Sequence, residues 1–549
     1  MPDVLITGAR VIDGTGNPWI YADVVLEGER IADIAPPGTV DRASAATVID
    51  AEGMICCPGF IDIQSHSIVP FLTDRRSVSK ITQGVTTEIM GEGWTPAPFG
   101  GKLDSPFSIS LVHRLEDEFD YWDKLGRTWT RFGHWLADLE QRGVSVNVGS
   151  FLGDGTLRKY AMGERMGTPS DAELDVMRRV TREAMEDGAL GIATALIYPP
   201  GSYAGTDDLV AVMTVVAEHH GVHITHIRSE GDEIFEGLAE AIEIAERSGV
   251  ATEIYHLKAA GPENWPKMAT VIERITEARE RGLDIGADMY PYDGSGTGLA
   301  ACLPPWASAD GKRYENLRDP EMREKILAEM RNPQDHWENL GARSGPEKVL
   351  LAEFSKPENK KYQGRFLADV ADELGMDWHE AIVTLLDSEG HDIFTMYLMI
   401  SEENLAQQFR QPWMKFGTDA GGIDPETNAA RSLVHPRAYG TYPRILGRYV
   451  REKGYMTWED AIRKASSAVA DRLGLRDRGL LRAGMYADVV VFDPETVIDT
   501  ATYTDPHHLS VGIRDVFVNG TAVLRDGEHT GALPGKRVNG LGYREDVGA

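Results

Sequence analysis

The feature that most constrains the fold is a series of short apolar runs that alternate with amphipathic stretches along the middle of the chain. Short apolar runs are typical of buried strands, and apolar residues spaced three and four apart are typical of helices. Helices are expected at residues 171–186, 234–247, 268–281 and 458–473, and strand-like runs at residues 60–63, 86–90, 144–150, 189–195, 222–226, 252–256, 284–290, 395–400 and 414–418. The alternation predicts a (β/α)8 barrel, which needs only eight strands, so at least one run is not a barrel strand.

Polar residues with metal-binding or proton-transfer chemistry stand at the ends of these runs. His66 follows the first run, His226 and His256 each close a later one, and Asp419 follows the last. In a barrel the carboxyl ends of the strands meet at one rim, where active sites form. Imidazole nitrogens suit Zn²⁺, and two or three of them can hold the ion while leaving a position for water. The sequence therefore predicts a metal site at the C-terminal rim.

The two ends of the chain have a different texture from the middle. Short β-rich segments broken by turn residues occupy residues 1–58, and the same sequence pattern occurs in residues 480–549. We expect these two segments to form one small β-sandwich beside a barrel that spans residues 59–479. A stretch at about 305–360, rich in charge, Pro and Asn, is expected to be an insertion in the barrel.

Charge and cysteine content exclude several functions. The net charge of −30 argues against a nucleic-acid partner, because phosphate binding needs positive charge. Three cysteines, two of them adjacent, cannot form a disulfide framework and fit a reducing cytoplasm. No signal peptide is visible at the start and no apolar run approaches a membrane span. These observations predict a cytoplasmic protein without a membrane partner, and a homo-oligomer is compatible with them.

The chain resembles the N-acyl-D-amino-acid deacylase (D-aminoacylase) family of the amidohydrolase superfamily along nearly its full length. The resemblance rests on motifs that occur in the family's order, at residues 8–16, 58–62, 83–87, 188–201, 225–228, 256–258, 288–292, 435–444 and 483–488. It implies a TIM-like (β/α)8 barrel with a small β-sandwich, a divalent metal that is usually zinc, and hydrolysis of the amide of an N-acylated D-amino acid.

The sequence departs from the family at residues that bind metal. The superfamily motif Gly-Phe-x-Asp-x-His-x-His has Gln64 in place of its first His, and a Gln carbonyl is a poor ligand for transition metals. The family's metal-binding Cys falls at Gly93, with Glu92 directly before it. Asp154 replaces another family His, and residues 190–198 lack the Lys that bridges two metals in dinuclear relatives. A single metal is therefore expected.

Two arrangements of that single metal are open. In the first, Glu92 replaces the family cysteine and joins His226 and His256, which gives a His2Glu site with water in the fourth position. In the second, His66, His226 and Asp419 hold the metal, with Gln64 as a weak fourth group. We favour the first, because a turn flanked by glycines and a longer side chain can absorb the shift of one residue.

The expected chemistry is metal-assisted hydrolysis. A bound metal lowers the pKa of its water and polarises the scissile carbonyl, and Asp419 can carry the proton to the leaving nitrogen. Lys258 lies two residues after His256, so on a strand both side chains point the same way. Candidates for contact with the substrate, including a clamp for its carboxylate, are Lys258, Tyr292, Arg437, Gln64 and Arg228.

Three functions are compatible with these residues. The first is hydrolysis of an N-acyl-amino acid. The second keeps hydrolysis of a C–N bond but acts on a different small or cyclic amide. The third is a descendant that binds a small molecule without catalysis, in which His226 and His256 are structural and Asp419 is a turn residue. Retention of both histidines together with Asp419 and Lys258 favours an enzyme.

Overall fold

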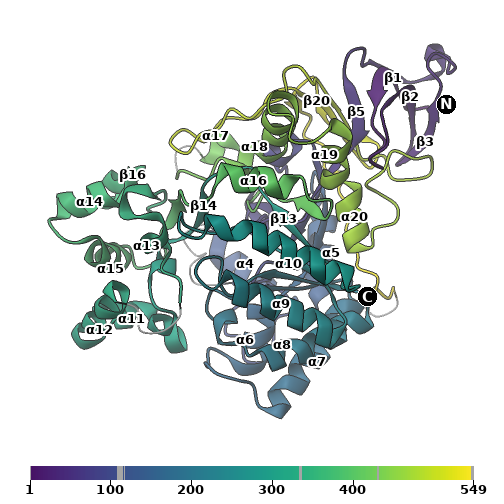
Figure 1. Ribbon diagram of the computed structural model, residues 1–549. Coiled ribbons are helices and arrows are strands. Elements are labelled where there is room, and N and C mark those ends of the chain that lie inside the picture. The colour runs from purple at the N-terminus through teal and green to yellow at the C-terminus, as the bar shows by residue number, and fades with distance from the viewer. Residues whose placement is uncertain (1, 108–114, 116–117, 333–336, 429–431, 546–549) are drawn as a thin grey trace.

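The computed structural model describes residues 2–107, 115, 118–332, 337–428 and 432–545, and Figure 1 shows its arrangement. The central part holds parallel strands with helices packed around them. A nine-stranded sheet made from both chain ends lies on one side, and a smaller group of helices and short strands projects on another. Residues 333–336 of the expected insertion and 546–549 of the expected C-terminal segment lie outside the described residues.

The central strands follow one another in the order of a (β/α)8 barrel. One sheet of three parallel strands and one of six meet where β8 gives way to β9, with only Phe151 between them. The strands are β6 (Phe60–Asp62), β7 (Val85–Met90), β8 (Asn147–Ser150), β9 (Leu152–Gly153), β10 (Gly191–Ala195), β11 (Val222–His226), β12 (Ala251–Ile254), β13 (Ile285–Met289) and β18 (Met414–Phe416). Nearly every residue in them is buried, as expected for parallel strands covered on both faces. Eight of the nine predicted runs supply all of these strands except β9.

Backbone contacts join the last strand to the first. The N–H of Asp419 donates to the carbonyl of Gln64 over 2.8 Å, and Ser65 and Ala420 form a parallel bridge. The Asp62 carboxylate accepts from the backbone N–H of Thr418 at 2.8 Å. These bonds set the segment after β6 beside the segment after β18, so that His66 and Asp419 become neighbours.

The covering helices follow the predicted spacing of apolar residues. Helix α7 (Asp171–Glu186) begins with a capping box between Ser170 and Glu173 and buries Met177 and Val180. Helices α9 (Ile234–Ser248) and α10 (Met268–Glu280) also lie close to their predicted bounds, and α8 (Thr206–Glu218) lies between α7 and α9 in the chain. The helix predicted at 458–473 is two helices, α19 (Trp458–Ala465) and α20 (Ser467–Leu473). The backbone of Ser466 leaves the helical region between them, at φ −134° and ψ −86°. Among the described residues, none of the helices combines the length and apolarity of a membrane span.

Both chain ends contribute to a single nine-stranded sheet. Its N-terminal strands are β1 (Val4–Val11), β2 (Ile20–Glu27), β3 (Arg30–Ala35), β4 (Thr47–Asp50) and β5 (Ile55–Pro58), and its C-terminal strands are β19 (Val489–Phe492), β20 (Ile513–Val518), β21 (Thr521–Arg525) and β22 (Glu528–His529). The two sets meet where β5 and β19 pair in antiparallel fashion. Because β6 follows β5 after one residue, this sheet is anchored next to the first barrel strand.

A second core lies in the segment between β13 and β18. Its four-stranded sheet contains β14 (Ser295–Gly298), β15 (Val349–Leu351), β16 (Arg365–Phe366) and β17 (Phe394–Tyr397), and its longer helices are α11 (Arg313–Arg318), α12 (Pro320–Arg331), α14 (Leu367–Leu374) and α15 (Trp378–Glu389). These helices stand apart from the barrel in Figure 1. The strand-like run at 395–400 belongs to this sheet, so it is the predicted run that is not a barrel strand. The segment with its own core is longer than the expected insertion at about 305–360.

A buried lysine ties the first and last barrel strands together. Lys80 and Asp62 are fully buried and form an ion pair, and the Lys80 ammonium also donates to the Thr418 hydroxyl and the Ala420 carbonyl. Replacing Lys80 with Met should lower the free energy of unfolding by about 3–5 kcal/mol, because it leaves the Asp62 carboxylate buried without its partner.

Urea unfolding would measure this loss. The matched control is Lys102→Met, which removes an exposed ion pair with Glu173 and should change stability by no more than about 0.5 kcal/mol. Equal small effects from both substitutions would contradict the assigned role of Lys80.

Candidate active site

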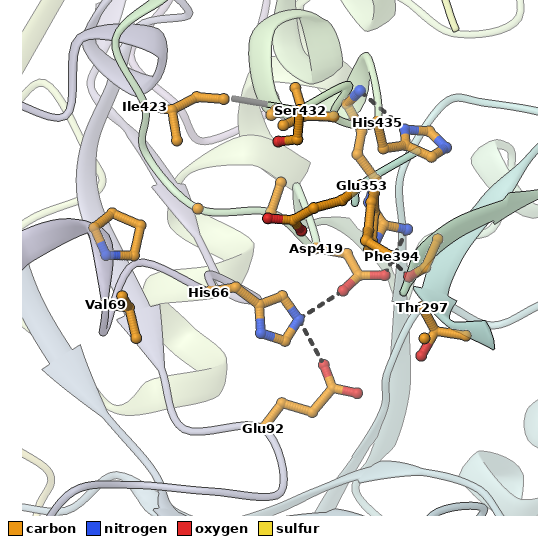
Figure 2. A pocket seen from close by; sticks show the side chains of 18 of the residues that line it. His66, Val69, Glu92, Thr297, Glu353, Phe394, Asp419, Ile423, Ser432 and His435 are labelled. Carbon is orange, nitrogen blue, oxygen red and sulfur yellow. Dashed lines mark hydrogen bonds and ion pairs between the residues drawn. The ribbon is translucent and has the colours of Figure 1, made fainter. Parts of the chain in front are cut away.

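The polar strand ends converge on one large pocket of about 1080 Å³. The pocket is lined by seven of the residues singled out from the sequence, namely His66, Glu92, His226, His256, Lys258, Asp419 and Arg437. Figure 2 shows its mouth, where His66 lies between Glu92 and Asp419. The other three candidates, Gln64, Arg228 and Tyr292, are not among the described residues that line it.

Glu92, His226 and His256 form the candidate metal site. Glu92 follows β7 in a turn where Gly91 and Gly93 both have positive φ, and a side chain at Gly91 would collide with the carbonyl of Phe151. One carboxylate oxygen of Glu92, Oε1, lies 3.5 Å from Nδ1 of His226 and 3.5 Å from Nε2 of His256. The turn therefore aims Glu92 at the two histidines.

This donor set fits a zinc ion. Zinc bonds of roughly 2.0–2.1 Å in a tetrahedral arrangement separate two ligand atoms by about 3.4 Å, close to the spacing found here. The candidate ligand atoms all lie within 4.8 Å of one another. Both ring nitrogens of His226 are buried, and neither has a hydrogen-bond partner in the described part of the chain. A buried imidazole nitrogen without a hydrogen bond is costly, and a metal ion between Nδ1 and Glu92 would satisfy it.

Glu230, which the sequence analysis did not single out, lies behind the two histidines. Its carboxylate is 3.0 Å from Nδ1 of His256 and 3.4 Å from Nε2 of His226, the nitrogens that face away from Glu92. Carboxylates in this position orient metal-binding histidines and fix which nitrogen carries the proton. Although burial opposes a charged carboxylate, His226, Lys258 and His256 hold the pKa of Glu230 below its ordinary value. Its position four residues after His226 was the only signal in the sequence.

Lys258 is engaged with the same carboxylate. Its ammonium lies 2.6 Å from Oε1 of Glu230 and 2.7 Å from Nδ1 of His256, and its side chain is buried. It lines the same pocket as His256, although both residues follow β12, which ends at Ile254, and so do not lie on a strand as expected. Its contacts link it to the histidine pair as well as to the pocket.

His66, Asp419 and Arg437 form a second charged group beside the first. Nε2 of His66 lies 2.8 Å from Asp419 and 3.4 Å from Glu92 (Figure 2). Arg437 pairs with the other oxygen of Asp419 at 2.8 Å. Burial opposes charge on His66, but hydrogen bonds to Asp419 and Glu92 raise its pKa to about 9. His66, Glu92 and Asp419 also lie close enough to hold an ion. Nε2 of His66 is already paired with Asp419, whereas neither ring nitrogen of His226 makes a hydrogen bond in the described part of the chain, so the geometry favours the Glu92 arrangement.

Asp419 is held as a carboxylate in a strained backbone conformation. Burial raises the pKa of a carboxyl group, yet Arg437 and the bond to His66 bring the pKa of Asp419 below its ordinary value. Asp419 and His256 have φ values of 51° and 31°, which non-glycine residues rarely adopt. Such strain often marks functional sites, where the surrounding structure holds it in place.

Three residues that line the pocket carry a buried hydrogen-bond donor without an acceptor. The hydroxyls of Tyr290 and Ser295 and the Nε of Arg437 have no hydrogen-bond partner in the described part of the chain. The Arg437 guanidinium lies over the Tyr290 ring, 4.6 Å from its centre. A cluster of donors with one guanidinium suits a carboxylate. Tyr290 and Ser295 were not singled out from the sequence: Tyr290 is the last residue of the predicted run at 284–290, and Ser295 begins β14, outside the predicted runs.

The three remaining candidates have partners elsewhere. Gln64 donates from Nε2 to Oε2 of Glu92 at 2.5 Å, so it orients the candidate ligand. Arg228 pairs with Glu240 and donates to two backbone carbonyls outside the pocket. Tyr292 donates to Asp499 at 3.1 Å, beneath Arg444. The structure therefore brings neither Arg228 nor Tyr292 to the pocket. His435 does line the pocket, and its Nδ1 accepts a hydrogen bond from the N–H of Arg437.

The fold and the site now allow a comparison with known proteins. A model of the amidohydrolase family matches residues 47–333 and 414–524, which leaves out much of the segment with the second core. The chain belongs to the amidohydrolase family. Within it, the chain is 32% identical to a D-aminoacylase of Alcaligenes xylosoxydans xylosoxydans, across 97% of each protein. It is also 32% identical to an N-acyl-D-glutamate deacylase from the same organism, over 95% of this chain and 93% of that protein.

Solved structures agree with the sequence comparison. The N-acyl-D-glutamate deacylase of Bordetella bronchiseptica, in complex with zinc and a phosphonate mimic of the tetrahedral intermediate, superposes with a TM-score of 0.80 at 30% identity. That match covers 98% of this chain and 99% of the other. A crystal structure of D-aminoacylase matches with a TM-score of 0.81 over 98% of this chain. The predicted family and barrel fold are confirmed.

Proposed function

We propose that this protein is a metal-dependent hydrolase that removes the acyl group from an N-acylated amino acid. The names of its relatives specify D-amino acids, and we propose the same configuration for its substrate. The observation that carries the proposal is the pairing of two features in one pocket. The His2Glu set suits a single zinc ion, and the unpaired donors of Tyr290, Ser295 and Arg437 suit a carboxylate. An N-acyl-amino acid has an amide and a carboxylate separated by one carbon.

Glu92, His226 and His256 would hold the metal. When bound, the metal lowers the pKa of a water molecule and polarises the scissile carbonyl. Gln64 orients Glu92 through its 2.5 Å hydrogen bond, and Glu230 holds the outer nitrogens of both histidines. These contacts keep the ligand atoms in place before the substrate binds. Such fixed geometry lets the reacting groups meet in the orientation that the reaction needs.

Asp419 would transfer the proton. Its lowered pKa keeps it ionised near neutral pH, so it can accept a proton from water and return it to the amide nitrogen as the C–N bond breaks. His66 donates to the same carboxylate and keeps its orientation. Arg437, Tyr290 and Ser295 would bind the substrate carboxylate and so fix the position of the amide. The products are a carboxylic acid and a free amino acid.

A substrate assay tests the proposal. Purified protein supplied with zinc should release acetate from N-acetyl-D-amino acids, much faster than from the L enantiomers or from N-acetyl-D-amino acid amides, which lack the carboxylate. Treatment with a chelator should abolish the activity, and added zinc should restore it. Equal rates on the uncharged amides, or hydrolysis of cyclic amides alone, would instead identify a different small amide as the substrate.

The cellular location and assembly stay predictions. The cysteines Cys56, Cys57 and Cys302 are all buried and free, which agrees with the predicted cytoplasm. Burial raises the pKa of each of these thiols, so they are poor nucleophiles.

A further inference from the structure

The segment between β13 and β18 reaches back to the loop that follows β11. Glu338 is buried, and its carboxylate accepts hydrogen bonds from three groups of the turn at Ser229, Glu230 and Gly231. The donors are the Ser229 hydroxyl, the N–H of Glu230 at 3.2 Å and the N–H of Gly231 at 2.5 Å. One carboxylate therefore satisfies three donors of a turn that belongs to the barrel.

The Glu338 carboxylate packs directly against Gly231. A Cβ at Gly231 would lie 2.8 Å from Oε1 of Glu338, closer than atoms approach without a shift. The carbonyl of Glu230 accepts from the N–H of Ala260 at 2.7 Å, which ties the turn to the segment after His256. The backbone of Glu230 is thus held from both sides, by Glu338 and by Ala260.

The side chain of Glu230 points from this turn to the histidine pair. It contacts Nε2 of His226, Nδ1 of His256 and the ammonium of Lys258. Glu230 and Lys258 together hold the Nδ1 side of His256, and its Nε2 faces Glu92. Small displacements of Glu230 would therefore rotate both rings away from the geometry that zinc needs.

We propose that Glu338 is a positioning residue for the metal centre, because it fixes the Ser229–Gly231 turn and so holds Glu230 against His226 and His256. Glu338 lies in the part of the chain that the family model does not match, between residues 333 and 414. The segment with the second core thus contributes to the metal site without touching it. This inference rests on the proposed metal site.

Zinc affinity tests the proposal. Competition with a chromophoric chelator would compare the full-length wild type with Glu338→Ala, Glu338→Gln and Glu230→Gln. Glu230→Gln and Glu338→Ala should each weaken zinc binding by about 10- to 100-fold, the usual effect of losing a residue that supports metal ligands. Glu338→Gln keeps an oxygen for Ser229 and Gly231 but loses the acceptor for the N–H of Glu230, so its zinc affinity should lie between those of the wild type and Glu338→Ala. A variant with both Glu338→Ala and Glu230→Gln should bind zinc no more weakly than Glu230→Gln alone, because Glu338 acts on the metal site only through Glu230.

Two further variants keep the test decisive. Gly231→Ala displaces the Glu338 carboxylate while leaving it in the chain, and it should also weaken zinc binding. Asp377→Ala is the matched control. Asp377 belongs to the same segment and also accepts from two backbone N–H groups, but these groups belong to the start of α15 and not to the Ser229–Gly231 turn. It should leave zinc affinity unchanged. The absorption spectrum of the cobalt-substituted protein should shift in Glu338→Ala and not in Asp377→Ala.

The outcomes separate this inference from the proposed function. If Glu338→Ala keeps the zinc affinity and the cobalt spectrum of the wild type, the proposed role of Glu338 is overturned. If Glu338→Ala does not fold, the same result in Gly231→Ala overturns it. Absence of zinc binding by the wild type would instead overturn the proposed metal site.

Discussion

Replacing Asp419 with Asn should lower kcat by about 10²- to 10⁴-fold and leave zinc bound, since the amide cannot carry the proton from water to the leaving nitrogen. The carboxylate lies between His66 and Arg437 at 2.8 Å from each, and Asn can keep part of this arrangement. Steady-state kinetics on an N-acetyl-D-amino acid, together with metal analysis of the same sample, would measure both quantities.

The control is Asp424→Asn, a carboxylate that lines the same pocket but pairs with Arg76. Its kcat should stay close to that of the wild type. If Asp419→Asn loses its zinc, Asp419 is a metal ligand and the arrangement with His66, His226 and Asp419 replaces the one argued here.

Replacing Arg437 with Gln should remove the charge that binds the substrate carboxylate. Losing one partner of a buried charge pair costs about 2–5 kcal/mol, or roughly 30- to 5000-fold in kcat/KM. The loss should be much smaller for the uncharged amide of the same substrate. Comparing the two substrates also cancels any effect that arises from the contact between Arg437 and Asp419 and is common to both.

Lys258→Met provides the contrast. Because Lys258 contacts Glu230 and His256, its loss should act on both substrates alike, through the histidines. A loss in Lys258→Met that is confined to the charged substrate would mean that Lys258 is the residue that binds the carboxylate. A loss in Arg437→Gln that is equal for both substrates would mean that Arg437 is not.

Most of the barrel could be predicted from the sequence, because its strands are buried on both faces and so appear as continuous apolar runs. The run at 395–400 has the same appearance but pairs with β14 and β15, and nothing local distinguishes a strand of a second sheet. The helix predicted at 458–473 was wrong at one residue, since the backbone break at Ser466 leaves the apolar spacing intact.

The candidate ligands could be predicted because each one ends a strand or follows it closely. His226 and His256 close their runs, and Glu92 occupies the turn after β7. Glu230 and Tyr290 lie in loops and Ser295 begins β14, a strand outside the barrel, so their positions depend on contacts between distant segments. Lys258 lies in the segment after β12 and not on the strand that the spacing argument assumed, and its partner Glu230 comes from another loop, 28 residues away in the chain. Local patterns identify which residues reach the rim, whereas their partners depend on the tertiary structure.

The most direct measurement is the zinc content of protein purified without added metal, for the wild type, Glu92→Ala and Gln64→Ala. The account predicts about one zinc per wild-type chain and none in Glu92→Ala. Gln64→Ala should retain the ion with an affinity weaker by about tenfold, because it loses only the hydrogen bond that orients Glu92. A wild type that binds no zinc even when the metal is supplied, or a Glu92→Ala variant that keeps its full zinc content, would contradict the central claim that Glu92, His226 and His256 form the metal site.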